Sequence, residues 1–68
     1  MTIEDLIPSL RAGWVAMDEE KNWMWFSHEP SAVNSWWRAS TGKVVNLSLA
    51  FDIEPAPYQW FYTKTKVR

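Results

Sequence analysis

Six tryptophans stand in a chain of only 68 residues, and the same chain contains no cysteine. A chain of this length holds one domain and lies near the size at which a single hydrophobic core is only marginally stabilising. Without cysteine no disulfide can restrict the unfolded chain, so packing must hold the fold. Each buried aromatic ring removes about 150–250 Å² from water. We therefore expect residues 1–68 to form one small domain whose core is built around aromatic side chains.

The N-terminal residues predict a short helical turn. Thr2 and Asp5 have the spacing of a helix capping pair, with acid in the first turn, where the helix dipole favours it. Pro8 lacks a backbone donor and stops a regular helix within about two turns. The helical turn is therefore expected over residues 2–7.

A β-hairpin is predicted next. The apolar residues 14–17 suit a strand, and the polar residues 18–22 have the length of a hairpin loop. Asn22 tolerates the left-handed conformation that such loops commonly need, and we expect it there. Residues 22–28 are apolar on both faces, which is typical of a central strand covered on each side.

The segment over residues 31–41 is open to two interpretations. As a helix it would be capped by Ser31 and would place its apolar residues on one side. As a strand it would cover residues 35–39 and turn just before Gly42. We prefer the strand, because the next segment begins so promptly after the glycine.

Two further strands are expected in the C-terminal part. Apolar and polar residues alternate from Lys43 to Glu54, which predicts a half-buried strand with an apolar face of Val45, Leu47, Leu49, Phe51 and Ile53. Residues 58–67 predict a last strand, one face of which is formed by Tyr58, Trp60, Tyr62, Lys64 and Lys66. The predicted fold class is mainly β, with a small α+β fold as the alternative. Its architecture is a single antiparallel sheet, a meander of four to five strands, with a short N-terminal helical turn.

Motifs that carry chemistry are scarce. His28 is the only histidine, and no serine or carboxylate is tied to it by a known local motif. His28 and Glu29 are adjacent, so on a strand they point to opposite faces and cannot share a metal ion. With two glycines, the chain has no loop that could cradle a phosphate. We expect no catalytic residue, no metal and no cofactor, and hence a protein that is not an enzyme.

Charge and hydropathy bear on location. The net charge is −1, and Glu4 and Asp5 lie where a secretory signal would carry base. No uncharged apolar stretch has the length of a membrane span. The sequence therefore predicts a cytoplasmic protein without membrane contact.

The tryptophans exceed what a thin sheet can cover, so some rings are expected at the surface. Exposed aromatic side chains concentrate binding energy, and contiguous apolar patches are rare on surfaces without a partner. We predict a patch that binds another protein or a second copy of the chain, made by Trp23, Trp25, Trp36, Trp37 and Trp60. The alternative is a structural domain whose rings wrap a thin core and stay half covered.

A third interpretation is binding of single-stranded nucleic acid by the last strand. Rings there, Trp60 among them, could stack on bases while cations contact phosphates. The residues in question are Tyr62, Lys64, Lys66 and Arg68. A few cations near a chain end more often form a solvated basic tail than a binding site. Nucleic acid is therefore the less favoured partner.

One pattern in the sequence is shared with a known group of proteins. A GWVAMD segment at 13–18 is followed by Trp23, by WFS at 25–27, and by Pro30 and Trp36. This pattern, which covers about half of the chain, resembles small uncharacterised proteins of bacteriophages and prophages. Residues 51–55 are similar to the C-terminal portion of the same group. The resemblance implies a bacterial cytosol and an accessory role, such as interference with a host or defence protein.

A shorter pattern consists of Gly13-Trp14, Trp25-Phe26 and Trp36. It is similar to the WW domain, a three-stranded sheet that grips proline-rich peptides between aromatic rings. The resemblance implies that Trp25 and Trp36 form a groove and that Trp14 is structural. The sequence departs from the WW pattern in three ways: Ala39 stands near the expected proline, His28 lies one residue early, and a further strand is predicted from Lys43.

Overall fold

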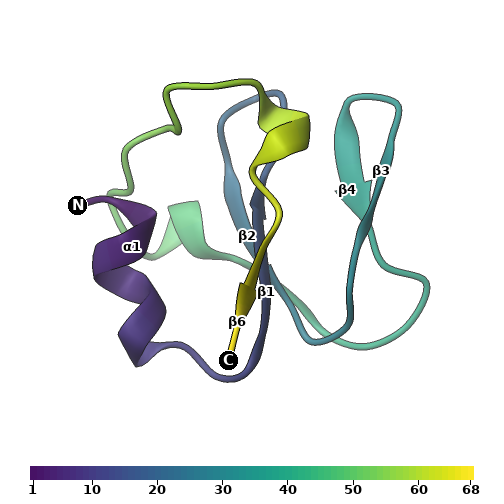
Figure 1. Cartoon of the computed structure of the whole chain (residues 1–68), viewed down its shortest axis with the longest axis horizontal. Coiled ribbons are helices and arrows are strands. Elements are labelled where there is room, and N and C mark those ends of the chain that lie inside the picture. Colours follow the sequence, from purple (N-terminus) through teal and green to yellow (C-terminus); the bar gives the residue numbers. More distant parts are fainter.

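A computed structural model describes all of residues 1–68 and consists mainly of short strands joined by turns (Figure 1). The helical part is α1 (Ile3–Leu6), which continues into a 3-10 turn, η1 (Ile7–Ser9). The strands are β1 (Gly13–Met17), β2 (Trp23–Phe26), β3 (Ser31–Val33), β4 (Trp36–Arg38), β5 (Val44–Asn46) and β6 (Thr65–Val67). Two more 3-10 turns are η2 (Leu47–Leu49) and η3 (Trp60–Tyr62). No helix here has the length and apolar character to cross a membrane.

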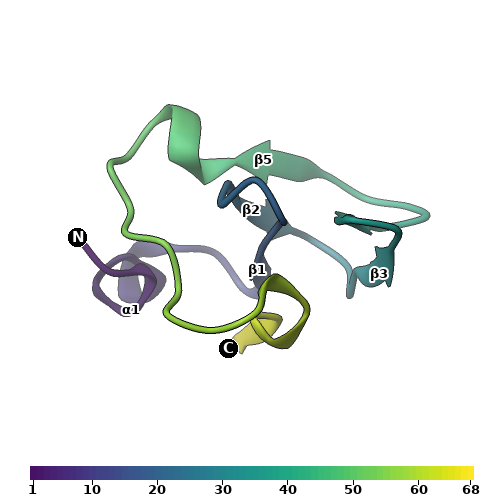
Figure 2. The same cartoon turned by 90° about the horizontal axis from the view of Figure 1, so that it is seen from above.

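The strands form two antiparallel sheets. The larger has the order β5-β2-β1-β6, and β3 pairs with β4 in a separate hairpin. Figure 2 shows α1 on one side of the larger sheet and the β3–β4 hairpin on the other. The mainly β, antiparallel fold class predicted from the sequence is confirmed. Its strands are divided between two sheets instead of following one another in a single meander.

The N-terminal helical turn is confirmed, and it begins with a capping box. The Thr2 hydroxyl accepts a hydrogen bond from the amide of Asp5 at 3.3 Å, and the Asp5 carboxylate accepts one from the amide of Thr2 at 3.0 Å. Hydrogen bonding of the charged Asp5 carboxylate to the Thr2 amide, and after it to the Thr2 side chain, holds the pKa of Asp5 below its ordinary value. Pro8 stands in the first turn of η1, where a missing N–H costs no helix bond.

The central hairpin pairs β1 with β2 in the register Met17 with Trp23 and Val15 with Trp25. In its loop the left-handed residue is Lys21, with φ of 68°, and the expectation for Asn22 is wrong. Asn22 lies just before β2 and closes the loop onto Asp18: its carbonyl accepts from the Asp18 amide at 3.0 Å and its amide donates to the Asp18 carboxylate at 2.9 Å.

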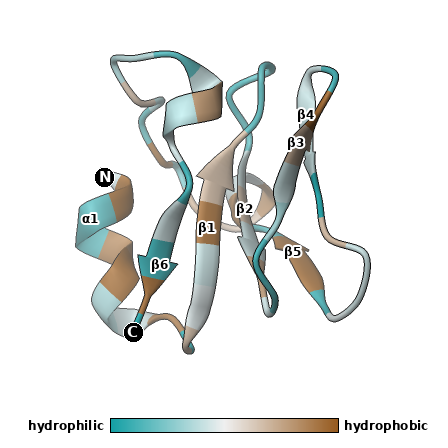
Figure 3. Ribbon diagram, turned by 45° about the vertical axis from the view of Figure 1, so that its right-hand side comes forward, coloured by the Kyte–Doolittle hydropathy of each residue, from teal (hydrophilic) through white to brown (hydrophobic).

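One face of the larger sheet carries the main core. Val15, Met17 and Trp23 point to this face, since residues two apart on a strand share a side. Helix α1 packs over them with its apolar side, as the alternating brown and teal of α1 in Figure 3 indicates. The other buried members of this cluster are Ile3, Leu6, Leu47, Ile53 and Val67.

The opposite face is also covered, which confirms the prediction of a strand buried on both sides. Ala16 and Phe26 are buried on this face, and Figure 2 shows the β3–β4 hairpin on the same side of the sheet. Trp37 ties the hairpin down, because its indole Nε1 donates to the carbonyl of Met17 at 2.9 Å. The strand expected over residues 35–39 is therefore confirmed as β4, and the helical alternative is wrong. Its partner strand β3 lies within the same ambiguous segment.

The strand predicted from Lys43 to Glu54 is wrong beyond β5. The chain leaves the sheet after Asn46, whose side-chain oxygen accepts from the Ser48 amide at 3.0 Å and starts η2. Ser48 then accepts from the Trp23 amide at 2.8 Å, so a side chain takes the place of the next backbone partner. The predicted apolar face is lost: Leu47 is buried, whereas Leu49 is 85% exposed.

The strand predicted over residues 58–67 is also wrong in its first half, which forms the turn η3. Thr63 is fully buried, and its hydroxyl accepts from the Met17 amide at 2.8 Å. The same oxygen lies 3.1 Å from the Met17 carbonyl and 2.6 Å from the Trp60 carbonyl. This hydroxyl occupies the edge of β1 where a longer strand would pair, so regular pairing is confined to β6.

Candidate functional site

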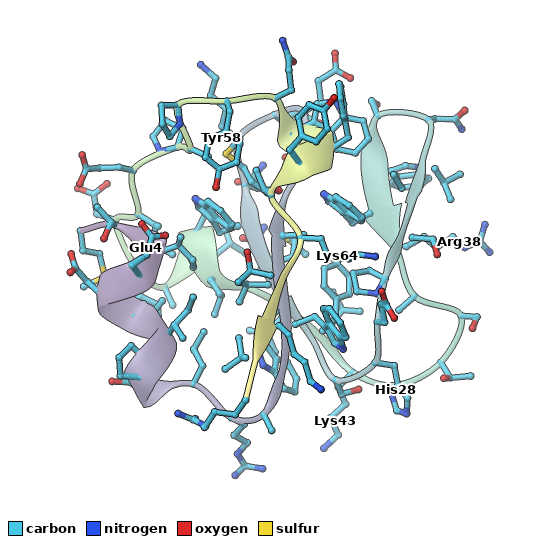
Figure 4. The ribbon with its side chains drawn as sticks, viewed as in Figure 1. Glu4, His28, Arg38, Lys43, Tyr58 and Lys64 are labelled. Carbon is cyan, nitrogen blue, oxygen red and sulfur yellow. The ribbon has the colours of Figure 1, made fainter.

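Four aromatic rings form a continuous row at one end of the molecule, where η3 faces the β3–β4 hairpin (Figure 4). The Trp37 and Trp60 centroids are 5.8 Å apart with ring planes at 83°, and Trp60 meets Phe61 at 5.6 Å and 84°. Phe61 and Tyr62 follow at 4.7 Å and 56°. Edge-to-face geometry of this kind is the favourable one for aromatic pairs. We call Trp37, Trp60, Phe61 and Tyr62 the aromatic row.

The outer half of the aromatic row lies in water. Phe61 is 46% exposed and Tyr62 is 72% exposed, while Trp37 and Trp60 are half-buried. Consecutive side chains of a 3-10 turn leave its axis in different directions, so η3 cannot hide all three of its rings. The buried Thr63 hydroxyl anchors the end of the turn and so fixes the row in place.

A cation sits at the inner end of the row. The Lys64 Nζ lies 5.8 Å from the centroid of the Trp14 ring and 5.9 Å from that of Trp37, within the distance of about 6 Å for a cation–π contact. It also lies 2.7 Å from the Glu29 Oε2. In Figure 4 the Lys64 side chain reaches from the segment before β6 toward the hairpin. We call Trp14, Glu29 and Trp37 the ammonium pocket.

Two of the tryptophans predicted for the binding patch lie on the other face of the sheet. Trp23 is only 1% exposed and its Nε1 donates to the Glu54 carbonyl at 3.0 Å, so its assignment to a surface patch is wrong. Trp25 is half-buried against the main core, and its Nε1 donates to the Arg11 carbonyl at 3.1 Å. It lines a hollow of about 230 Å³ that does not include Trp36, its partner in the WW resemblance.

The other three predicted tryptophans lie on or near the hairpin. Trp37 and Trp60 meet in the aromatic row, as a patch requires. Trp36 is 56% exposed but, as the neighbour of Trp37 on β4, it points to the opposite side of the hairpin. The predicted set therefore contributes two members to one surface, and the others do not join them.

The residues of the nucleic-acid interpretation do not form one charged face. Tyr62 ends the aromatic row, and Lys64 is paired with Glu29. Arg68 turns toward η1, where its Nη1 donates to the Pro8 carbonyl at 3.3 Å. Lys66 is exposed on β6.

One contact near His28 escaped the sequence analysis. The Ser27 hydroxyl lies 3.0 Å from the His28 Nδ1 and accepts a hydrogen bond from the Lys43 amide at 2.8 Å. No carboxylate hydrogen-bonds to this histidine among the side-chain bonds of the fold. No group of three or more His, Asp and Glu side chains is placed to hold a metal ion.

Phe61, the contact of Trp14 with Lys64, and the pairing of Glu29 with Lys64 are the parts of the site that the sequence analysis missed. Three consecutive aromatic residues, 60–62, were the available signal, because they cannot share one face of a strand. Glu29 and Lys64 are 35 positions apart in the chain, and no local pattern links them. Comparison of the chain with protein-family models, with curated proteins and with solved structures finds no match.

Proposed function

We propose that this chain is a non-enzymatic protein-interaction module and that the aromatic row is its contact surface. The observation that carries the proposal is the exposure of Phe61 (46%) and Tyr62 (72%) at the end of a packed row of rings. A chain this short needs its aromatic side chains for its own core. Rings left in water at a fixed position are the residues that supply most of the binding energy at protein interfaces.

The row is also suited to binding by its rigidity. Trp37 is held by its bond to the Met17 carbonyl, and η3 is held by the buried Thr63. Rings with few rotatable bonds that are already fixed lose little conformational entropy on contact with a partner. The partner we propose is a protein that offers an apolar surface to these rings.

The resemblance to bacteriophage and prophage proteins supports a bacterial cell as the place where this function is carried out. We infer a chain that works in the bacterial cytosol and contacts a host or defence protein. A role in single-stranded nucleic-acid binding has less support, because two of the cations that it needs make contacts within the chain.

The test is retention of proteins from a lysate of the native host by three immobilised forms of the chain. The first is the wild type, the second carries Phe61→Ala with Tyr62→Ala, and the third carries Tyr58→Ala. Tyr58 is an exposed tyrosine outside the aromatic row and is the matched control. We expect a protein that the wild type and the control retain and that the double variant loses.

Sedimentation of the same three forms shows whether the partner is a second copy. Self-association would appear as a mass that rises with concentration in the wild type and the control but not in the double variant. If all three forms retain the same proteins, or if none retains any and all stay monomeric, the proposal is wrong.

A further inference from the structure

The ammonium pocket has the composition of a receptor for a cation. Two indole rings present negative faces, and the Glu29 carboxylate adds a full negative charge beside them. The Lys64 ammonium occupies this place in the free chain, which shows which kind of group the pocket accepts. Its contact with Glu29 at 2.7 Å is short enough for a charge-assisted hydrogen bond.

We propose that Trp14, Glu29 and Trp37 form a binding site for a primary alkylammonium group, which Lys64 fills in the free chain and which a lysine of a partner protein enters when Lys64 leaves. The ligand is a primary ammonium because the group that fills the site in the free chain, Lys64 Nζ, is one, and it donates an N–H to Glu29. A quaternary ammonium can contact the rings but has no hydrogen to give to the carboxylate.

The two ring walls of the site do not depend on Lys64. Trp14 lies in the middle of the β1 ladder, between Phe26 and Lys66. Trp37 is fixed by its bond to the Met17 carbonyl and by the Trp60 ring. The two indole rings therefore keep their positions when the lysine moves out.

Lys64, in contrast, can leave. Its side chain is 32% exposed, and it stands between η3 and β6, outside either element. A lysine side chain is flexible, and its ammonium is strongly hydrated in water. Hydration therefore offsets the contacts that the Lys64 ammonium loses when the side chain leaves the site. An added ligand competes with Lys64, which is tethered next to the site by the chain. A higher ligand concentration is therefore needed to fill the site.

The site adds detail to the proposed function, because it says which side chain of the partner is bound. This assignment to a partner protein rests on the proposed function. Trp37 belongs to both the ammonium pocket and the aromatic row, so the two form one continuous surface. A partner that covers Phe61 and Tyr62 with an apolar surface would place a lysine at the inner end of the row. The surface thus selects an apolar patch flanked by a lysine.

Chemical rescue tests the site without any partner. In Lys64→Ala the missing part of the side chain is n-propylammonium, which is added at increasing concentration while the thermal midpoint is followed. We expect a saturable rise of the midpoint relative to equal sodium chloride, and a smaller rise with tetramethylammonium. In the wild type the same response should need at least about tenfold more amine, because Lys64 competes from within the chain.

Two variants serve as controls. Lys43→Ala removes an exposed lysine that has no contact with the three residues of the pocket and should respond as the wild type does. Adding Glu29→Gln to Lys64→Ala should abolish the rescue. If Lys64→Ala is unfolded on its own, n-propylammonium must restore its near-ultraviolet circular dichroism.

The site is refuted if n-propylammonium has no effect, or if Lys64→Ala and Lys43→Ala respond equally. It is also refuted if tetramethylammonium acts as strongly as the primary amine. None of these results depends on a partner, so the rescue can fail while the aromatic row still binds protein, and the reverse.

Discussion

Trp23 and Trp36 show how differently one residue type is used at two positions of the same small fold. Trp23 is 1% exposed with its indole N–H bonded to the Glu54 carbonyl, whereas Trp36 is 56% exposed on the outer side of β4. Period-2 alternation places each ring on a face of its strand but cannot say what covers that face. Which indoles lie in the core was therefore not available from the sequence.

We predict that Trp23→Ala lowers the free energy of unfolding by about 3–5 kcal/mol, the usual cost of emptying a buried aromatic site. Trp36→Ala serves as the control and should cost less than about 1 kcal/mol, since surface changes away from such features have small effects. Urea denaturation followed by circular dichroism measures both. Equal losses in the two variants would contradict the burial described for Trp23.

Among the elements, those built from local contacts were predictable and those built from distant ones were not. The capping pair at Thr2 and Asp5 and the β1–β2 hairpin follow from residues close together in sequence. The ends of β5 and of η3 depend on Ser48 and Thr63, whose hydroxyls bond to backbone 25 and 46 positions away. The alternation of apolar residues does not indicate that a side-chain hydroxyl takes the place of a backbone hydrogen-bond partner at these points.

For α1 we predict a dependence on pH that Asp5 controls. Because its folded pKa lies below the ordinary value, the ionised carboxylate stabilises the fold above the unfolded pKa, which is about 3.9. This contribution is lost as the pH falls through the lower folded pKa. Asp5→Asn should therefore show a smaller fall in thermal midpoint than the wild type between neutral and acid pH. Parallel curves for the two proteins would show that the capping box carries none of the acid sensitivity.

At the scale of the whole molecule, the candidate site combines segments that are far apart in the chain. Trp14, Glu29, Trp37 and Lys64 come from β1, the β2–β3 connection, β4 and the segment before β6. The surplus of tryptophan predicted exposed aromatic residues, and an exposed aromatic cluster is present. Its membership could not be predicted, because the paths of the β3–β4 hairpin and of η3 over the sheet decide which rings meet.

The packing on both faces of the larger sheet involves the β1–β2 hairpin, so we predict that the two layers unfold together. Tryptophan fluorescence reports on both faces of the sheet, and far-ultraviolet circular dichroism reports on the backbone. Their urea transitions should coincide, as two-state unfolding requires. An earlier fluorescence transition would mean that the β3–β4 hairpin detaches while the larger sheet remains.

The double covering of β1 and β2 also bears on how this chain can change over generations. Val15 and Ala16, neighbours that point to opposite faces, are both without exposure, so β1 is tightly packed on both of its faces. Apart from the buried Leu47 and Ile53, most of residues 43–59 are exposed or partly exposed, and substitutions at those exposed positions disturb little packing. Related proteins that diverge from this chain would differ first at those exposed positions. The tryptophan-rich β1–β2 hairpin would keep recognisable sequence similarity the longest.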